Sequence, residues 1–324
     1  MRAVICREYG TPEDLVVEDL PDPTPGPGQV VVKVHAAAVN YPDVLLIAGK
    51  YQIKVPPPFS PGSELAGDVL AVGDGVDLRP GDRVSATSFV GAFSEQAVVD
   101  ARGLTPIPDG VDYADAAAFG VTNRTAYYTL RTVAPVKPGD WVVILGAAGG
   151  VGLAAVDIAV LMGARVIAAA SDPEKLEICR QRGAQALIDY DREDLKARLK
   201  EITGADGAQV VLDPVGGRYS EPALRGLGRG GRFVTLGYAA GEIPAIPLNL
   251  VMLKGITVVG MEIRTFATDY PDQIGRDDAE LAALFAEGKL RPYIGARFPL
   301  EQAATALRYV ADRKAVGKVV IDIA

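Results

Sequence analysis

One stretch decides the fold of this 324-residue chain: Trp141-Val-Val-Ile-Leu-Gly-Ala-Ala-Gly-Gly-Val-Gly-Leu153. Its apolar run predicts a buried strand, its clustered glycines a tight turn, and the small residues after them a helix. A strand expected at 165–170 completes a strand–helix–strand unit of about thirty residues. Glycines allow close approach of a phosphate, and the positive helix end faces it. The stretch therefore predicts a dinucleotide pyrophosphate site, although Ala147 departs from the usual glycine pattern and an ordinary turn is the alternative.

The rest of the chain shows two patterns of predicted secondary structure. Residues 1–120 contain short β-branched runs separated by turns rich in proline and glycine, which predicts a compact β-barrel. From residue 121 strands and helices alternate, which predicts an α/β domain with a parallel, doubly wound sheet. The tail carries expected helices at 277–287 and 300–312 and a closing strand at 318–323. We therefore predict one domain of 1–120 with 265–324, and a second of 121–264.

Composition excludes several classes of protein. The net charge of −8 and a pI near 4.9, with no long Lys/Arg run, argue against nucleic-acid binding. Two cysteines without metal-binding spacing are expected to be free thiols, and no apolar leader is visible, so we expect a cytoplasmic protein. Residues 142–164 are long enough to span a bilayer, but Asp157 and the glycines favour a strand and a helix, so we expect no membrane span.

Short motifs along the chain resemble the medium-chain dehydrogenase/reductase superfamily, in its zinc-independent, zeta-crystallin-like quinone oxidoreductase branch. The matching motifs, in order, are Ala38-Val-Asn-Tyr-Pro-Asp43, Pro61-Gly-Ser-Glu64, Gly81-Asp-Arg-Val84, Thr125-Ala126, Gly146–Gly152, Asp213-Pro-Val-Gly-Gly217, Gly230-Gly-Arg232 and Gly317-Lys-Val319. The resemblance implies a GroES-like β-barrel catalytic domain and a Rossmann domain that binds a nicotinamide cofactor.

The resemblance also bears on metals. Zinc-dependent members hold their catalytic metal with a Cys-His pair and a His-Glu pair, and the corresponding residues here are Asn40-Tyr41 and Ser63-Glu64. Three of these four cannot serve as ligands. The single histidine, His35, lies in a strand-like run and is interpreted as a packing or hydrogen-bonding residue. We therefore expect an enzyme without a metal.

Charge at the end of the second predicted strand indicates the cofactor. Enzymes that prefer NADH place a carboxylate there, which would repel a 2′-phosphate, whereas this chain has Ala170. The resemblance implies that four residues surround the 2′-phosphate of NADPH: Ser171, Lys175, Tyr190 and Arg313. We expect NADPH to be preferred over NADH. The alternative for this segment is helix capping alone, either by a Ser171–Glu174 capping box or by Asp172 followed by proline.

The resemblance implies further site residues in three groups. Cofactor-binding residues are Ala148, Gly149, Gly150, Val151, Asp213, Gly237 and Tyr238; catalytic residues are Asn40, Tyr51 and Thr125; substrate-lining residues are Tyr41, Tyr128 and Leu45. The nicotinamide ring would lie in the cleft between the domains. The Tyr51 hydroxyl could stabilise developing negative charge on a carbonyl oxygen. For each tyrosine the alternative is a ring whose hydroxyl is already bonded within the protein. Asp43 and Glu64 are interpreted as structural.

The acceptor is expected to be small and hydrophobic. Leu45, Ile47 and the proline-rich 56–59 segment make the predicted mouth apolar, which favours a quinone. An α,β-unsaturated carbonyl or enoyl-CoA ester is the main alternative. An alternative of another class is a non-catalytic NADPH-binding protein with a structural or RNA-binding role. The β-branched run at 255–260 is expected to form a sheet edge that pairs in a homodimer.

Overall fold

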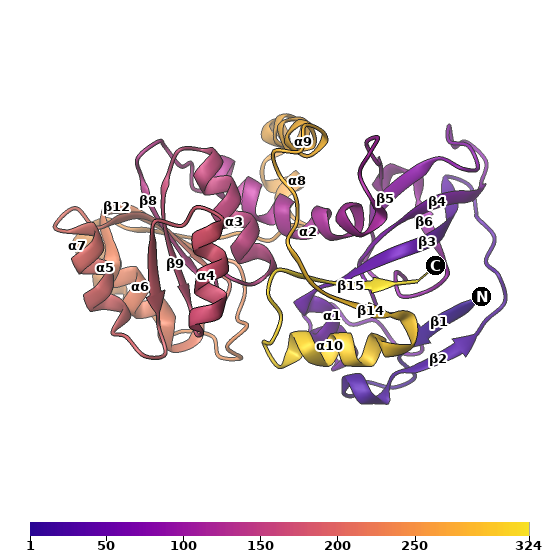
Figure 1. The fold of residues 1–324 in the computed structure, drawn as a ribbon, viewed down its shortest axis with the longest axis horizontal. Coiled ribbons are helices and arrows are strands. Elements are labelled where there is room, and N and C mark those ends of the chain that lie inside the picture. Colours follow the sequence, from indigo (N-terminus) through magenta and orange to yellow (C-terminus); the bar gives the residue numbers. More distant parts are fainter. Residues whose placement is uncertain (324) are drawn as a thin grey trace. The chain divides into compact units, whose positions relative to one another are not determined.

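The computed structural model describes residues 1–323, which form two compact units (Figure 1). The first comprises residues 1–121 and the chain from Arg291 onward, and the second is Thr122–Leu290. Our expected boundary at 264/265 is therefore wrong, since residues 265–290 belong to the second unit. The reason lies in α9 (Pro271–Ala286), whose acidic side chains bond to residues of α2 (Tyr113–Tyr128) and of the π-helical turn η3 (Thr129–Val133) that follows it.

The first unit is built on a mainly antiparallel seven-stranded sheet. Its strands run in the order β14-β15-β3-β4-β5-β7, with β6 also paired to β3. The bounds are β3 (Gln29–Val39), β4 (Glu64–Val72), β5 (Arg83–Thr87), β6 (Gln96–Asp100), β7 (Leu104–Pro106), β14 (Ile294–Pro299) and β15 (Lys318–Asp322). β15 pairs with β3 from Val319↔Val39 to Asp322↔Ala36, which confirms that the tail strand returns to the first domain.

Smaller elements complete this unit. A hairpin-like pair, β1 (Arg2–Ile5) and β2 (Val16–Asp19), and two helices, α1 (Tyr41–Ile47) and α10 (Ala303–Ala311), accompany the sheet. One apolar core joins residues from the first hundred positions to the tail, among them Val32, Leu65, Phe93, Leu307 and Ile321, all of which are fully buried. The core explains why the tail belongs with the barrel, because β15 and α10 contribute apolar faces that would otherwise be exposed to water.

The second unit is a six-stranded parallel sheet in the order β10-β9-β8-β11-β12-β13, as predicted. The bounds are β8 (Trp141–Leu145), β9 (Arg165–Ala170), β10 (Ala186–Asp189), β11 (Ala208–Asp213), β12 (Leu227–Thr235) and β13 (Thr257–Gly260). The chain moves outward from β8 to β10 and then returns to place β11 beside β8. In open α/β sheets ligands bind at such a switch point, beyond the carboxyl ends of the strands.

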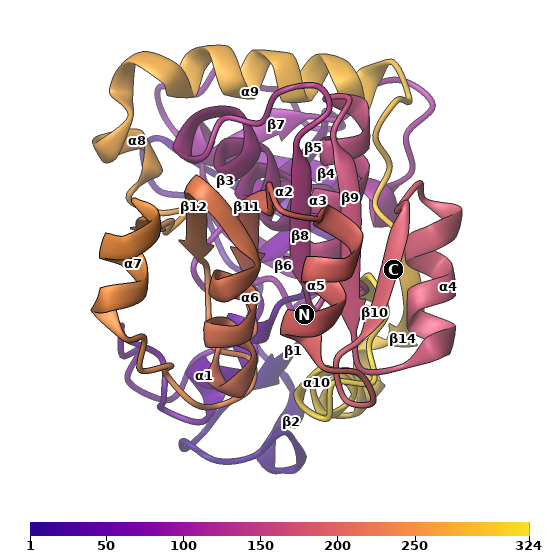
Figure 2. The ribbon, with the colours of Figure 1, turned by 90° about the vertical axis from the view of Figure 1, so that its left-hand side faces the viewer.

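Helices cover both faces of this sheet. They are α3 (Gly150–Leu161), α4 (Pro173–Gln181), α5 (Leu195–Thr203), α6 (Ser220–Gly226) and α7 (Leu248–Lys254). Figure 2 shows α5 and α6 in front of the strands, and α9 across the top of the same view. Because both faces are covered, β8 reads as an unbroken apolar run and is buried from Val142 to Leu145. None of the helices in the described chain is long and apolar enough to cross a membrane.

Candidate functional site

The glycine turn between β8 and α3 is as tight as predicted. Gly146 has a φ of 58°, and Gly149 caps α3 while donating its N–H to the Gly146 carbonyl at 2.9 Å. A Cβ on Gly152 would overlap the Gly146 carbonyl oxygen, so only glycine permits this packing. The first N–H groups of a helix have no acceptor within it, so those of Gly150 and Val151 are available to an anion. The turn therefore places backbone N–H groups suited to a phosphate at the switch point.

The loop after β11 packs against this turn. Asp213 is buried, and its Oδ1 accepts the N–H groups of Val215 and Gly216, each at 2.8 Å, while Oδ2 accepts the Ser220 hydroxyl at 2.6 Å. Burial raises the pKa of this carboxyl, against the effect of these donors. Our assignment of Asp213 as a cofactor-binding residue is thus corrected: its carboxylate is used within the loop, and its role is to shape that loop.

The segment after β12 lies beside the same loop. Leu236 donates its N–H to the Asp213 carbonyl at 2.9 Å, and Ala239 donates to the Pro214 carbonyl at 3.2 Å. Gly237 and Tyr238 lie between these two bonds, and the Tyr238 hydroxyl accepts a weak bond from Thr235 at 3.4 Å. The structure thus brings Gly149, the Asp213 loop and Gly237 to one edge of the sheet.

The carboxyl end of β9 is where a 2′-phosphate was expected. Tyr190 follows β10 and donates its N–H to the Ala170 carbonyl at 3.1 Å, which places it next to Ser171. The N-cap of α4 is Asp172, which accepts the N–H of Glu174 at 2.7 Å and of Lys175 at 3.3 Å. The Ser171–Glu174 capping box is therefore wrong, and the exposed Ser171 is not used as the cap.

Two basic residues were assigned to that phosphate. Lys175 lies in the first turn of α4, and burial lowers the pKa of its ammonium group, an effect that the Asp172 charge opposes. Arg313 follows α10 in the first unit, is exposed and has a φ of 58°. The structure therefore places Ser171, Lys175 and Tyr190 in one unit and Arg313 in the other.

A buried polar cluster surrounds Asn40 in the first unit. The Asn40 Nδ2 donates to Glu64 Oε2 at 2.8 Å and to Ser63 Oγ at 3.2 Å, and its Oδ1 accepts from Lys318 Nζ at 2.7 Å. Lys318 can only donate and Glu64 can only accept, so these partners determine the orientation of the amide. Lys318 was not among the predicted site residues, although it lies within the Gly317-Lys-Val319 motif.

Two acids support the cluster, as interpreted from the sequence. Glu64 accepts from Lys318 at 2.8 Å and from the backbone N–H of Val121. Asp43 is fully buried, accepts the Asn40 N–H at 2.7 Å, and completes a capping box at the start of α1. Burial raises the pKa of Asp43 to about 7, partly opposed by its bond from Asn40 and by the Lys318 charge.

The remaining predicted site residues differ in their surroundings. Tyr41 and Leu45 are half-buried and one turn apart on α1, and the half-buried Tyr51 ring lies 6.2 Å from that of Phe89. Ile47 is buried in the barrel core, so our expectation that it lines the mouth is wrong. Thr125 is buried on α2, where its carbonyl accepts the Thr129 hydroxyl at 2.7 Å.

Tyr128 requires a correction. Its ring is buried and stacks on Phe266 with a centroid separation of 4.0 Å and an interplanar angle of 7°. Its hydroxyl donates to Asp278, and burial raises the pKa of that hydroxyl. The alternative left open for the tyrosines holds here, since this hydroxyl is bonded within the protein.

No group of three or more His, Cys, Asp or Glu residues within 1–323 could hold a metal ion. His35 Nε2 lies 2.9 Å from Asp68 Oδ2, and its ring stacks on Tyr113 at 4.4 Å. The interpretation of His35 as a hydrogen-bonding residue is confirmed. Both cysteines are buried and free.

Comparison with known proteins gives matches over nearly the whole chain. Residues 26–109 match the alcohol dehydrogenase GroES-like domain family, and 150–276 match the zinc-binding dehydrogenase family. The chain is 39% identical to a quinone oxidoreductase-like protein 2 homolog of Nematostella vectensis, over 99% of this chain and 88% of that protein. It is 36% identical to a quinone oxidoreductase of Pseudomonas aeruginosa, over 97% of each. The solved structure of Escherichia coli quinone oxidoreductase complexed with NADPH superimposes with a TM-score of 0.91, at 30% identity, over 99% of this chain and 100% of that one.

Proposed function

Because this chain belongs to the medium-chain dehydrogenase/reductase superfamily, in its quinone oxidoreductase branch, we propose that it reduces quinones with NADPH. One observation carries the choice of cofactor. The strand β9 beside the glycine turn ends at Ala170, without the carboxylate that would repel a 2′-phosphate. Ser171 and Lys175 follow directly and offer a hydroxyl and an ammonium group instead.

The residues present fit NADPH at both phosphate positions. The N–H groups of Gly150 and Val151 would hold the pyrophosphate, because the first N–H groups of α3 have no acceptor within the helix. Ser171, Lys175 and Tyr190 of the second unit are proposed to hold the 2′-phosphate, and Arg313 of the first unit stays a prediction from the resemblance. A charge-assisted bond from an ammonium group contributes roughly 1.5–3 kcal/mol, enough to select one cofactor over the other.

The reduced nicotinamide supplies a hydride when bound, and the protein must orient it. Asn40 and Thr125 are our proposed contacts for this ring. Both amide hydrogens of Asn40 are bonded within the cluster, so the residue can only accept a further hydrogen bond, at the second lone pair of Oδ1. The hydroxyl of Tyr51 is proposed to donate to the acceptor oxygen, where it would stabilise developing negative charge.

The acceptor is proposed to be a hydrophobic quinone. Tyr41 and Leu45 lie on one face of α1, and Tyr51 follows that helix, so one short segment supplies both apolar surface and a hydroxyl. The test follows the loss of NADPH absorbance with 1,4-quinones, enones and enoyl-CoA esters in parallel. We expect the highest kcat/KM with quinones. Faster turnover of an enoyl-CoA ester would reassign the acceptor, and binding of NADPH without turnover of any acceptor would favour a non-catalytic role.

We also propose a homodimer formed through β13, and a cytoplasmic location remains our expectation. β13 is the edge of the parallel sheet, and exposed apolar residues continue from it onto α7, where Leu248 and Met252 are 77% and 74% exposed. An open strand edge with an apolar border is suited to pairing with a second copy about a two-fold axis. Light scattering should show a dimer that Met252→Glu converts to a monomer. The matched change Leu161→Glu, at an exposed apolar position of α3, should leave the dimer intact.

A further inference from the structure

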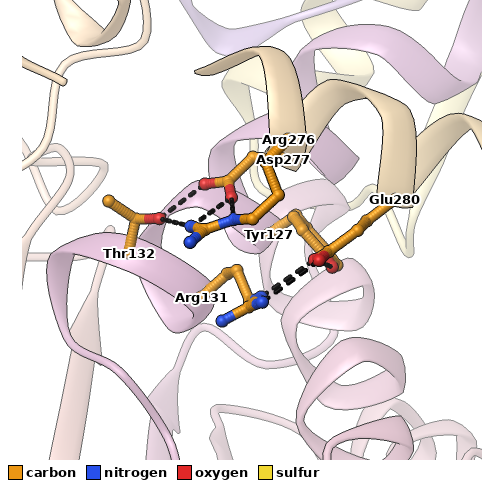
Figure 3. Close-up of polar contacts among 6 residues, drawn as sticks. All are labelled: Tyr127, Arg131, Thr132, Arg276, Asp277 and Glu280. Atoms are coloured by element: carbon orange, nitrogen blue, oxygen red, sulfur yellow. Dashed lines mark hydrogen bonds and ion pairs between the residues drawn. The ribbon is translucent and has the colours of Figure 1, made fainter. Parts of the chain in front are cut away.

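Three acids on α9, Asp277, Asp278 and Glu280, form what we name the acidic stripe. Each binds a hydroxyl group and an arginine (Figure 3 shows the contacts of Asp277 and Glu280). Apart from Arg276, which precedes Asp277 on α9 itself, their partners belong to α2 and η3. The contacts join segments that lie about 150 residues apart in sequence.

Glu280 binds a tyrosine and an arginine of the α2 end at the same time. Its Oε2 accepts the Tyr127 hydroxyl at 2.6 Å and Arg131 Nε at 2.9 Å, while Oε1 accepts a second guanidinium nitrogen of Arg131 at 3.1 Å. These bonds, with that from Arg131 first, lower the pKa of Glu280 to about 2. A two-point bond between arginine and a carboxylate determines orientation as well as distance.

The other two acids of the stripe, Asp277 and Asp278, bind neighbouring residues of the same helix end. The fully buried Asp277 accepts the Thr132 hydroxyl at 2.6 Å and Arg276 Nε at 2.9 Å. Asp278 accepts the Tyr128 hydroxyl and lies 3.5 Å from Arg124 Nε. The Tyr128 ring stacks on Phe266 of α8 (Phe266–Asp269), just before α9. The acidic stripe therefore holds more than two turns of the helix end.

These partners flank Thr125. Residues 124, 127, 128 and 131 recur at the three- and four-residue spacing of one helical face, and Thr125 lies within that run on a neighbouring face. From Thr129 the helix widens into η3, where Ala134 donates to the Thr129 carbonyl at 2.8 Å. Such π-helical turns occur often at functional sites. A widened helix end has fewer regular bonds to maintain its geometry, so external contacts determine its position.

We infer that the acidic stripe consists of positioning residues, which hold the α2 end so that the side chain of Thr125 meets the nicotinamide ring. The inference rests on the proposed function, since it requires Thr125 to contact the cofactor. Loss of a charge from the acidic stripe would allow the C-terminal end of α2 to change its orientation. It would not remove any group that is proposed to bind phosphate. Hydride transfer depends on geometry, so even a displacement of about 1 Å could cost up to a hundredfold in rate.

The test compares Glu280→Gln and Asp278→Asn with Glu287→Gln, a change at the exposed C-terminal end of the same helix. We expect kcat with a quinone to fall roughly tenfold in the first two variants, with the Kd for NADPH changed less than about twofold. The fluorescence of bound NADPH should shift toward that of free NADPH, because its ring is held less firmly. Glu287→Gln should match the wild type in all three measurements.

Two outcomes would overturn the inference. One is a lowered thermal midpoint with unchanged kcat and unchanged NADPH fluorescence, which would assign the stripe to stability alone. The other is an equal loss in the Glu287→Gln control. If the two stripe variants do not fold, Tyr127→Phe removes one hydroxyl and keeps its buried ring, and the same readouts apply. Failure of the wild type to bind NADPH or reduce quinones would instead contradict the proposed function.

Discussion

Lys318 Nζ donates to Asn40 Oδ1 at 2.7 Å although the two residues lie 278 positions apart. The antiparallel pairing of β15 with β3 produces this contact. Val319 lies opposite Val39 in the register, so the neighbouring residues Lys318 and Asn40 lie opposite each other. Lys318 is therefore the one cation bonded to both Asn40 and Glu64 in the described structure.

Removal of this ammonium group should strongly destabilise the protein. Lys318→Met leaves the buried carboxylate of Glu64 without its paired cation, and breaking a buried pair in this way costs about 3–5 kcal/mol. Denaturant unfolding should show this loss, and the double variant with Glu64→Gln should recover part of it. Lys314→Met, at an exposed position near the same strand, is the control. Equal midpoints for the two lysine variants would contradict the argument.

Asp43 should make stability decrease with rising pH. Its pKa is about 7 in the folded protein and about 3.9 unfolded, so between these values only the folded state holds the proton. The contribution of Asp43 to the free energy of unfolding then falls by about 1.4 kcal/mol per pH unit until about pH 7. Asp43→Asn should flatten the profile measured by urea unfolding from pH 5 to 8. Asp74→Asn, in an exposed turn, should keep the wild-type slope, and an unchanged slope in Asp43→Asn would refute the prediction.

Lys175 should select the cofactor. Lys175→Ala removes the ammonium proposed to bind the 2′-phosphate, so the KM for NADPH should rise roughly ten- to a hundredfold while that for NADH changes little. Steady-state kinetics with both cofactors measure the difference. Lys196→Ala, at an exposed position of α5, should affect neither. An equal rise for both cofactors would remove the case for a phosphate contact.

Gly152→Ala should abolish NADPH binding. The added Cβ would overlap the Gly146 carbonyl oxygen, so the turn and the start of α3 must separate, and the N–H groups of Gly150 and Val151 would lose their alignment. Calorimetric titration with NADPH measures this effect. Gly275→Ala is the matched control, because a Cβ there would meet nothing within 4 Å. Wild-type affinity in Gly152→Ala would show that the turn does not hold the cofactor.

Tyr51 should contribute to turnover. If its hydroxyl stabilises the acceptor oxygen, Tyr51→Phe should lower kcat roughly tenfold or more and change the KM for NADPH little. Tyr9→Phe removes a hydroxyl that donates to the Val55 carbonyl at 2.8 Å and should leave kcat unchanged. Unchanged turnover of every acceptor in Tyr51→Phe would discard this role.

The sequence alone determined the local features of this protein. The apolar run of β8, the glycine turn and α3 are specified by neighbouring residues, because side-chain periodicity and glycine backbone freedom act over short distances. The same local signals were ambiguous where two capping residues competed, and only the structure distinguished Asp172 from Ser171. The return of the closing strand to the barrel was also predictable from its β character.

Tertiary structure decided what depends on distant partners. Asp213 and Tyr128 looked like ligand-facing residues because their positions along the chain fit that role, but their polar atoms are bonded to Ser220 and Asp278. Residues 265–290 joined the second unit through ion pairs of α9 that no local pattern encodes. Lys318 reached Asn40 only through strand register. A buried polar group needs a hydrogen-bond partner. Which residue becomes that partner depends on how the whole chain packs and not on the neighbouring residues in the sequence.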